Sequence, residues 1–361
     1  MKIIIDARFT RTDHHDGISR YGASLIAATA KLADVSMLIS DPRQLALLPD
    51  VPYTLINSPL SPTELFVARK VNRLGADVVV CPMQTMGSWG RKYGLVLTLH
   101  DLIYYENPTP PGFLPAPVRL LWRLYHKAYW PQRLLLNRAD TVATISQTTR
   151  ALMAKYRLTR RPVRIVSNAP QPDQQPRNPD AGADRSLVYM GSFMPYKNVE
   201  TMIAGMASLP GYTLHLLSRI TPHRLAELEV LVPPGADVIF HNGVTDPEYT
   251  ALLQRATALI SLSRAEGYGL PLVEAMSVGT PVIASDIPIF REVGGDAVSY
   301  VDPGSPAAFA AAVRRLDDAE RWQEASLLSV KRAGEFSWED SARQLVSVAE
   351  EIMASRGRKG T

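Results

Sequence analysis

The 361-residue sequence has a single cysteine, Cys81, and lacks any long apolar run. One thiol excludes an internal disulfide and a metal site built from paired thiolates, and it favours a reducing compartment. At the start of the chain, MKIIIDARF, only three apolar residues precede the charged Asp6, too few for a signal-peptide core. No stretch approaches the roughly 20 apolar residues of a membrane span. We therefore expect a cytoplasmic protein that is not integral to a membrane.

The charge is unevenly divided along the chain. Residues 1–170 hold 22 Lys and Arg against 11 Asp and Glu, whereas residues 171–361 hold 17 against 24. Within residues 113–138, basic side chains alternate with Trp and Tyr in VRLLWRLYHKAYWPQRLLLNR. Such a helical pattern is typical of a surface that contacts anionic lipid or phosphate groups, and it predicts peripheral attachment to the inner face of a membrane. A solvated basic face with its aromatic rings packed on the core is the alternative.

Nucleic acid is the other class of partner that positive charge suggests. The sequence contains neither zinc-finger spacing nor an RNA-binding aromatic motif, so we expect no nucleic-acid partner.

Short apolar runs alternate with helix-patterned stretches along the whole chain, which predicts parallel sheets covered by helices. The runs lie at 2–6, 77–81, 95–100 and 141–146, and the same alternation restarts at LVYMG, residues 187–191. Between them, residues 169–185 carry four prolines without apolar periodicity, which indicates a linker. We expect domains at 1–170 and 186–336, joined by a linker at 171–185. Ligands of such sheets bind at the carboxyl ends of the strands.

The stretch SRAEGYGLPLVEAMSVGTPVIAS, residues 263–285, places two glutamates on either side of a glycine-rich turn. We expect Glu266 in a loop after a strand, Pro271 at the first position of the next helix, and Glu274 in its first turn. Backbone N–H groups of residues 269–272 would then form an anion site at the helix start. A sugar nucleotide offers a diphosphate for that site and hydroxyls for the two carboxylates. Each glutamate taken alone also fits a structural role.

The segment EGYGLPLVE resembles the E-x7-E signature of the retaining GT-B glycosyltransferases of family four, and the run on to AMSVGTPVIASDIPIFREVGGDA is similar to their nucleotide-binding domain. The resemblance covers essentially the whole chain. It implies an α/β protein of GT-B fold, with two Rossmann-like doubly wound domains, a cleft between them, and a C-terminal helix at 337–355 that packs back on the first domain. It also implies that Glu274 binds the ribose, that Glu266 holds the hexose near its 3-hydroxyl, and that the amides of Gly269 and Leu270 receive the diphosphate.

The segment YMGSFMPYKN resembles the glycine loop of the same family, in which Lys197 would neutralise the diphosphate and stabilise it as a leaving group. A solvated surface lysine is the alternative, and the position after a predicted strand argues against it. Many members carry an arginine where this chain has Ser192 or Tyr196. Arg264 and Arg219 are the candidate substitutes for that missing cation.

In the first half of the chain, LVLTLHD places His100 at a strand end, where the resemblance implies contact with the donor sugar and the reacting phosphate. Asp101 beside it is interpreted as structural. In HHDGISRYGASL, Gly17 lies between a strand and a helix. There it would allow close approach of the donor phosphate or acceptor, with a plain turn glycine as the alternative.

The sequence contains no Asp-x-Asp pair. This absence argues against the metal-bridged diphosphate of the other large glycosyltransferase fold, so we expect no metal and no cofactor. The predicted reaction is retaining transfer of a hexose from a nucleotide-diphosphate sugar to a glycan or lipid-linked acceptor. GDP-mannose is the candidate donor, and base contacts are expected near His241 to Val244. A GT-B epimerase, hydrolase or phosphorylase, or a non-catalytic glycan-binding protein, remains the alternative.

Overall fold

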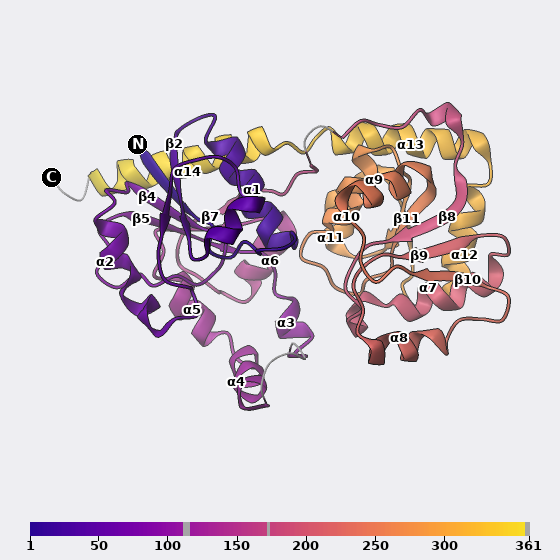
Figure 1. The fold of residues 1–361 in the computed structure, drawn as a ribbon, viewed down its shortest axis with the longest axis horizontal. Coiled ribbons are helices and arrows are strands. Elements are labelled where there is room, and N and C mark those ends of the chain that lie inside the picture. The colour runs from indigo at the N-terminus through magenta and orange to yellow at the C-terminus, as the bar shows by residue number, and fades with distance from the viewer. Residues whose placement is uncertain (111–115, 172–173, 358–361) are drawn as a thin grey trace. The chain divides into compact units, whose positions relative to one another are not determined.

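The structure is a computed structural model that describes residues 1–110, 116–171 and 174–357. The chain forms two compact units. Unit 1 comprises Met1–Ala169 together with Ser337–Thr361, and unit 2 comprises Pro170–Phe336. The chain therefore leaves unit 1 once and returns to it for its last helix (Figure 1).

Unit 1 is built on a seven-stranded parallel sheet in the order β3-β2-β1-β4-β5-β6-β7. Its strands are β1 (Lys2–Asp6), β2 (Asp34–Ile39), β3 (Tyr53–Leu55), β4 (Val78–Cys81), β5 (Gly94–Leu99), β6 (Thr141–Thr144) and β7 (Val163–Ile165). The register pairs Ile3 of β1 with both Val35 and Val78. The strand order reverses between β1 and β4, which is the point where doubly wound sheets bind their ligands.

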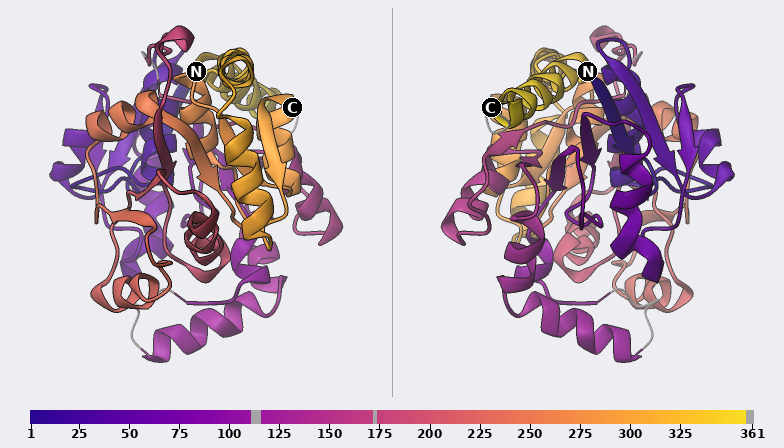
Figure 2. Two further views of the ribbon diagram at one scale, coloured as in Figure 1. Left: turned by 90° about the vertical axis from the view of Figure 1, so that its right-hand side faces the viewer. Right: turned by 90° about the vertical axis from the view of Figure 1, so that its left-hand side faces the viewer.

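The helices of unit 1 connect these strands and cover the sheet. They are α1 (Gly17–Thr29), α2 (Val67–Asn72), α3 (Ile103–Glu106), α4 (Ala116–His126), α5 (Trp130–Leu136), α6 (Gln147–Lys155) and α14 (Trp338–Gly357), with 3-10 turns at Pro42–Leu47 and Pro62–Phe66. Helix α4 lies at one end of the unit, away from the sheet (Figures 1 and 2).

The central strands of unit 1 form because their sequences are almost wholly apolar. Every residue of β4 and β5 is buried; valine predominates in β4 and leucine in β5. Parallel strands covered on both faces have this composition, because neither face meets water.

Helix α14 packs on unit 1 against α1 and the strands β4 and β5. Its start is capped by Ser337, whose hydroxyl oxygen accepts a hydrogen bond from the backbone N–H of Asp340 at 3.0 Å. The indole of Trp338 meets the ring of Tyr21 edge-on at 5.9 Å. Further along, the helix runs so close to β5 that a β-carbon on Gly94 would lie 2.5 Å from Cγ2 of Ile352.

Unit 2 repeats the architecture with a six-stranded parallel sheet in the order β10-β9-β8-β11-β12-β13. Its strands are β8 (Asp184–Tyr189), β9 (Thr213–Leu216), β10 (Asp237–Phe240), β11 (Ala256–Ser261), β12 (Val282–Ser285) and β13 (Val298–Val301). The reversal falls between β8 and β11. The loops after these two strands carry Lys197 and Glu266.

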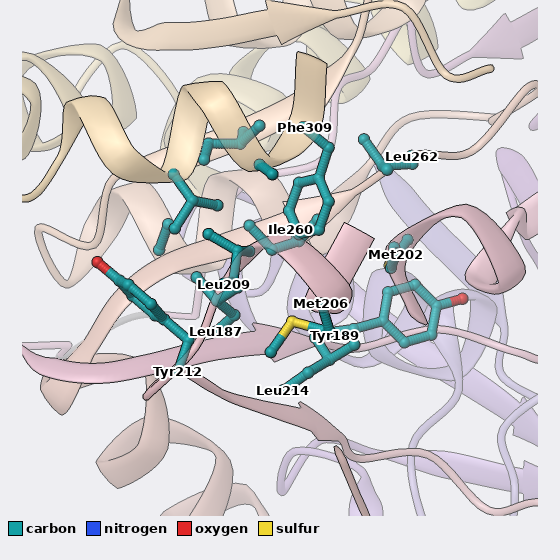
Figure 3. Close-up of a cluster of buried hydrophobic side chains, with 14 of the residues drawn as sticks. Leu187, Tyr189, Met202, Met206, Leu209, Tyr212, Leu214, Ile260, Leu262 and Phe309 are labelled. Atoms are coloured by element: carbon teal, nitrogen blue, oxygen red, sulfur yellow. The ribbon is translucent and has the colours of Figure 1, made fainter. Parts of the chain in front are cut away.

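The helices of unit 2 complete its core. They are α7 (Val199–Gly205), α8 (Pro222–Glu229), α9 (Asp246–Arg255), α10 (Leu270–Ser277), α11 (Pro288–Gly294), α12 (Pro306–Arg315) and α13 (Ala319–Ala333), with 3-10 turns at Pro179–Ala181, Pro195–Lys197, Met206–Ser208 and Gly295–Ala297. Figure 3 shows Phe309 of α12 among the side chains of one apolar cluster, with Ile260 and Met202 from the sheet and α7. Phe309 is fully buried there.

The predicted class of fold, two doubly wound α/β units, is confirmed, whereas the cleft between them stays a prediction. The predicted linker at 171–185 includes residues 172–173, which lie outside the described residues. Its later part is ordered on unit 2, because Arg177 donates to the backbone oxygen of Ala256 at 2.9 Å and β8 already begins at Asp184.

We predict that replacing Gly94 with alanine destabilises unit 1. The added methyl group overlaps Ile352 and must push α14 away from β5, which costs about 1–3 kcal/mol of the free energy of unfolding. Urea unfolding, monitored through hydrogen exchange of the α14 amides, would report on the stability of unit 1 separately from that of unit 2.

Gly22 provides the matched control. It lies inside α1, and its β-carbon would first meet Pro82 Cγ at 4.0 Å. G22A should leave the unfolding free energy unchanged or raise it by up to about 1 kcal/mol, since alanine favours a helix over glycine. Equal stability of G94A and G22A would contradict the close packing of α14.

Candidate functional site

The turn between β11 and α10 is shaped by one glycine. Gly269 has φ of +94°, a left-handed conformation, and a β-carbon there would lie 2.8 Å from Cε1 of Phe290. Both observations require glycine at this position. Gly269 is the N-cap of α10, so the helix begins at Leu270 and Pro271 is its second residue.

This start corrects two predictions about the helix. Glu274 was expected in the first turn, but it is the fifth residue of α10 and lies in the second turn, 7% exposed. The anion site was expected to use backbone N–H groups of residues 269–272. Proline has no N–H, and the N–H of Leu272 donates to the carbonyl oxygen of Gly269 at 2.9 Å. The amides of Gly269 and Leu270 are therefore the ones that can point at a ligand.

Lys197 and Glu266 form an ion pair. Nζ of Lys197 lies 2.5 Å from Oε1 of Glu266, and the two side chains are 15% and 13% exposed. The hydroxyl of Ser263 donates to the same carboxylate oxygen at 2.8 Å. Sequence motifs 69 positions apart predicted these two residues for different parts of a donor, and the structure brings them into direct contact.

Asn198 holds the loop that carries Lys197. It is 3% exposed, and its φ of +58° is left-handed, which asparagine tolerates better than most residues. Its side-chain amide donates to the carbonyl oxygens of Leu262 at 2.9 Å and Pro303 at 2.7 Å, and its oxygen accepts from the hydroxyl of Thr201 at 2.8 Å. Asn198 was not among the site residues predicted from the sequence, although an asparagine directly after the lysine was a signal for such a turn.

The candidate arginines lie on two different loops. The backbone N–H of Arg264 donates to the carbonyl oxygen of Tyr196 at 2.8 Å, and its guanidinium contacts Oδ1 of Asn198 at 3.3 Å, so its exposed side chain adjoins the Lys197 loop. Arg219 lies elsewhere, against Gly243, whose β-carbon would be 3.1 Å from Cγ of Arg219. Arg264 therefore adjoins the Lys197 loop through Tyr196 and Asn198.

The backbone of Ser192 is fixed from within unit 2. Its carbonyl oxygen accepts a hydrogen bond from the hydroxyl of Tyr189 at 2.7 Å. Burial raises the pKa of Tyr189 well above its usual range, so this phenol stays protonated and able to donate. A β-carbon on Gly191 would lie 2.7 Å from the same hydroxyl oxygen.

The expected base-binding segment follows β10. Nε2 of His241 lies 2.9 Å from Nδ1 of His215 on the neighbouring strand. Burial, and then the neighbouring imidazole of His241, lower the pKa of His215. Val244 is half-buried and immediately precedes Thr245, the N-cap of α9.

His100 follows the end of β5 in unit 1. Its Nε2 lies 2.7 Å from the carbonyl oxygen of Pro82, and its ring meets that of Tyr21 edge-on at 5.0 Å. A carbonyl oxygen only accepts, so Nε2 carries the proton and Nδ1 of the neutral ring is the acceptor. Burial is the main effect on the pKa of His100 and lowers it, against smaller opposite effects of the Pro82 carbonyl and the charge of Asp16.

Gly17 is the first residue of α1, after the N-cap Asp16, whose carboxylate accepts from the backbone N–H of Ser19 at 2.9 Å. A β-carbon on Gly17 would meet no described atom of unit 1 within 4 Å, so packing within that unit does not require glycine there. Asp101 accepts a hydrogen bond from the N–H of Ile103 at 3.0 Å, as a structural turn residue does.

A buried ionic network at the carboxyl end of β1 was missed by the sequence analysis. The side chain of Arg8 is fully buried, with Nε 2.7 Å from Asp6 and Nη1 2.6 Å from Glu64. Burial alone would lower the pKa of Arg8, but the two carboxylates outweigh it and raise the pKa. Nearby, Gln44 donates to the carbonyl oxygen of Thr10 at 2.6 Å. Together these contacts fix the loop that leads to α1, and nothing in the local sequence identifies Glu64 as the partner.

The predicted site residues thus fall into two groups. Lys197, Glu266, Glu274, Gly269 and Arg264 lie in unit 2 with Leu270 and Val244, while His100 and Gly17 lie in unit 1. In the described parts of the chain, no three His, Cys, Asp or Glu side chains come together as metal ligands.

We predict that His100 is neutral at pH 7 and titrates below the ordinary histidine pKa of 6.5. Because the unfolded chain then takes up the proton first, the contribution of His100 to the free energy of unfolding is fully present above about pH 6.5. It is lost as the pH falls through the folded-state pKa. An NMR titration of the imidazole, with the resonance identified through H100Q, measures both the pKa and the tautomer. Titration at or above 6.5 would contradict the burial of this ring.

Two family profiles match the chain. The profile described as Glycosyltransferase Family 4 matches residues 16–174, and the one described as Glycosyl transferases group 1 matches residues 171–326. The O-antigen chain mannosyltransferase RfbU of Salmonella typhimurium is 22% identical over 309 residues, 83% of this chain and 87% of its own. The O-antigen chain mannosyltransferase B of Escherichia coli is 28% identical over 274 residues, 70% of this chain and 69% of its own.

Among solved structures, Anabaena HepE in complex with UDP and glucose has the same fold, with a TM-score of 0.73 and 18% identity over 97% of this chain and 100% of its own. The two doubly wound units of the present chain are those of the GT-B fold. Because the two family matches together span residues 16–326, the chain belongs to the group 1 glycosyltransferases of glycosyltransferase family four.

Proposed function

We propose that this glycosyltransferase moves a hexose, with retention of anomeric configuration and without a metal ion, from a nucleotide-diphosphate sugar to a glycan or lipid-linked acceptor. The observation that carries the proposal is the Lys197–Glu266 pair beside the left-handed turn at Gly269, at the carboxyl ends of β8 and β11. This is the edge of a doubly wound sheet where ligands bind.

When a donor binds, Lys197 can exchange its partner Glu266 for the diphosphate. Without a donor, Lys197 and Glu266 neutralise each other at 2.5 Å. An arriving diphosphate competes for Nζ of Lys197, and the carboxylate is then available to accept hydrogen bonds from hexose hydroxyls. Ser263 holds Glu266 in position throughout, because its hydrogen bond does not depend on the lysine. In the reaction, Lys197 stabilises the negative charge that develops on the departing diphosphate.

Helix α10 contributes the remaining donor contacts. The amides of Gly269 and Leu270 at its start point toward a diphosphate, where the partial positive charge of the helix end favours an anion. Glu274, one turn further on, takes the ribose hydroxyls. The close contact of Gly269 with Phe290 keeps the direction of these amides constant.

The second cation of the site is Arg264, which lies beside the Lys197 loop through its contacts with Tyr196 and Asn198. With two cations and a helix start available, no metal bridge is required, in keeping with the lack of an Asp-x-Asp pair. The leaving diphosphate itself then takes up the proton of the acceptor hydroxyl on the same face of the sugar.

In unit 1, Nε2 of His100 donates a hydrogen bond to the carbonyl oxygen of Pro82, so Nδ1 is the remaining polar atom of the ring. A neutral Nδ1 accepts but does not donate, which suits a sugar hydroxyl better than a phosphate oxygen. Gly17, whose surroundings are open, leaves room for the donor phosphate or the acceptor.

Mannose is the proposed hexose and GDP-mannose the proposed donor. Support comes from the two O-antigen chain mannosyltransferases that match most of the chain. The base is proposed to contact the segment that ends at Val244.

Donor binding provides the first test. We expect one of GDP, UDP, ADP and TDP to raise the Tm of the wild-type protein, with GDP the expected one, since a ligand at 100 times its Kd stabilises by about 2.7 kcal/mol. K197A removes the diphosphate cation and E274Q the ribose carboxylate, so either change should abolish this stabilisation.

The matched controls are K331A and E324Q, which make the same chemical changes at exposed positions of α13. They should respond to nucleotide as the wild type does. Because Glu274 is buried, the Tm of E274Q without ligand is measured as well, to separate lost binding from lost folding. Nucleotide stabilisation of wild-type size in both K197A and E274Q would refute the assigned roles.

The reaction provides the second test. Incubation with the selected donor and an acceptor glycan should give a product whose anomeric configuration, measured by NMR, equals that of the donor, at a rate unchanged by EDTA. Inverted product or loss of activity with EDTA would refute retention or metal independence. Donor consumption without acceptor, phosphorolysis with orthophosphate alone, or binding without turnover would replace transfer by one of the alternative activities.

A further inference from the structure

Helices α4 and α5 present a row of large apolar side chains to solvent. None of the residues of α4 is buried. The exposed side chains, between 43% and 67% exposed, form what we call the α4–α5 face: Val118, Leu120, Leu121, Leu124, Trp130 and Leu134. Single exposed leucines are ordinary on protein surfaces, but a contiguous group of this size marks an interaction site.

The α4–α5 face is also hollowed. A groove of about 500 Å³ runs between α4 and the start of α5, and its walls are apolar and aromatic. The lining residues are Val118, Leu121, Trp122, Leu124, Tyr125, Trp130 and Pro131. Such a volume is typical of a preformed binding site, and this lining suits a hydrocarbon chain.

Aromatic contacts join the two helices to the rest of unit 1. The ring of His126 lies tilted on that of Trp122 at 4.0 Å and meets Tyr105 edge-on at 5.1 Å, and Tyr129 stacks between Tyr105 at 4.4 Å and Tyr156 at 4.6 Å. Burial lowers the pKa of His126, which keeps this stack uncharged at neutral pH. The apolar row is therefore presented by an anchored pair of helices.

The segment that carries the α4–α5 face has charges of one sign. Residues 107–139 contain no Asp or Glu and five basic residues, Arg119, Arg123, Lys127, Arg133 and Arg138. The first three recur every four positions, so Arg119 and Arg123 share one side of α4, beside the leucines. Helices with this pairing of a leucine row and a cationic row lie in the interface of a bilayer.

We propose that the α4–α5 face binds an anionic lipid leaflet. The leucines and Trp130 enter the boundary between headgroups and acyl chains, one acyl chain occupies the groove, and the basic side chains contact lipid phosphates. With 11 residues, α4 is about 16 Å long, against roughly 30 Å of hydrocarbon, so it lies along the surface. No helix in the described parts of the chain is long and apolar enough to cross a membrane.

Charge decides against a second copy of the chain as the occupant. Two α4–α5 faces packed together would bring both sets of basic side chains into one interface, and residues 107–139 of neither copy contain an acid to compensate them. A lipid surface supplies the missing negative charge. The proposal rests on the proposed function in one respect: an enzyme bound to the leaflet would find a lipid-linked acceptor in that same leaflet.

The test is co-sedimentation of the full chain with vesicles of 30% phosphatidylglycerol and 70% phosphatidylcholine, compared with pure phosphatidylcholine. Wild-type protein should bind the anionic vesicles and be released at high salt. L121E/L124E places two charges in the apolar row and should lower the partition coefficient at least tenfold. R119Q/R123Q should lower it roughly 25-fold, about fivefold for each charge near the surface.

Unit 2 offers matched controls for both variants. Leu327 and Leu328 of α13 are 59% and 39% exposed, so L327E/L328E makes the same change away from the α4–α5 face. R315Q/K331Q removes two positive charges there. Both should bind vesicles as the wild type does. The proposal would be overturned if the wild-type protein did not bind anionic vesicles. It would also be overturned if the L121E/L124E and L327E/L328E variants lost vesicle binding equally.

Two further readouts separate this proposal from others. Stabilisation of L121E/L124E by nucleotide should equal that of the wild type, which would show that the variant is folded and has lost vesicle binding alone. Wild-type protein that binds nucleotide but no vesicles would overturn the membrane surface and leave the proposed function standing. Light scattering without lipid should give the same mass for wild type and L121E/L124E. If the wild type were a dimer and L121E/L124E a monomer, the face would be a protein interface and the proposal would be overturned.

Discussion

In both sheets, buried strands pair only with parallel neighbours, and a parallel pair must be joined by a crossover that returns the chain to the edge where it began. The carboxyl ends of the strands in one sheet consequently share one edge. Lys197 after β8 and Glu266 after β11 are distant in sequence, yet they meet at 2.5 Å because those two strands are neighbours. The site of unit 2 is thus a consequence of strand pairing, completed by glycine and asparagine at the two positions where the chain must turn left-handed.

In both sheets, the edge formed by the carboxyl ends of the strands carries charged side chains that are largely buried. Lys197 and Glu266 are about 15% exposed, and in unit 1 Arg8 and Asp6 are fully buried at the end of β1. Charges removed from water are tolerated when they are paired and hydrogen-bonded, and removal of one partner is costly for the other. These two pairs differ in one respect. The side chain of Arg8 is fully buried between two carboxylates, whereas both side chains of the Lys197–Glu266 pair remain partly exposed, as the proposed exchange for a diphosphate requires.

How far the sequence could predict this structure depended on the length of the signals. The strands at 2–6, 77–81, 95–100 and 141–146 were predicted within one or two residues, because each is a continuous apolar run. The short strands β3 and β7 were not predicted, since their three residues are partly exposed. The predicted start of α10 was displaced by one residue, because only the backbone of Gly269 decides where that helix begins. The Glu64 partner of Arg8 and the exposed groove of α4 and α5 depend on tertiary packing, which no local pattern records.

The return of α14 to unit 1 has a consequence for biosynthesis. A ribosome completes the seven strands of unit 1 with residue 165, but the helix that covers β4 and β5 is not made until the whole of unit 2 has followed. At ordinary elongation rates of about 5–20 residues per second, that delay is roughly 10–40 s. During this interval the apolar strip beside Gly94 and the ring of Tyr21 lack their cover. The second unit, although later in sequence, is the first whose sheet and helices are all present on the nascent chain.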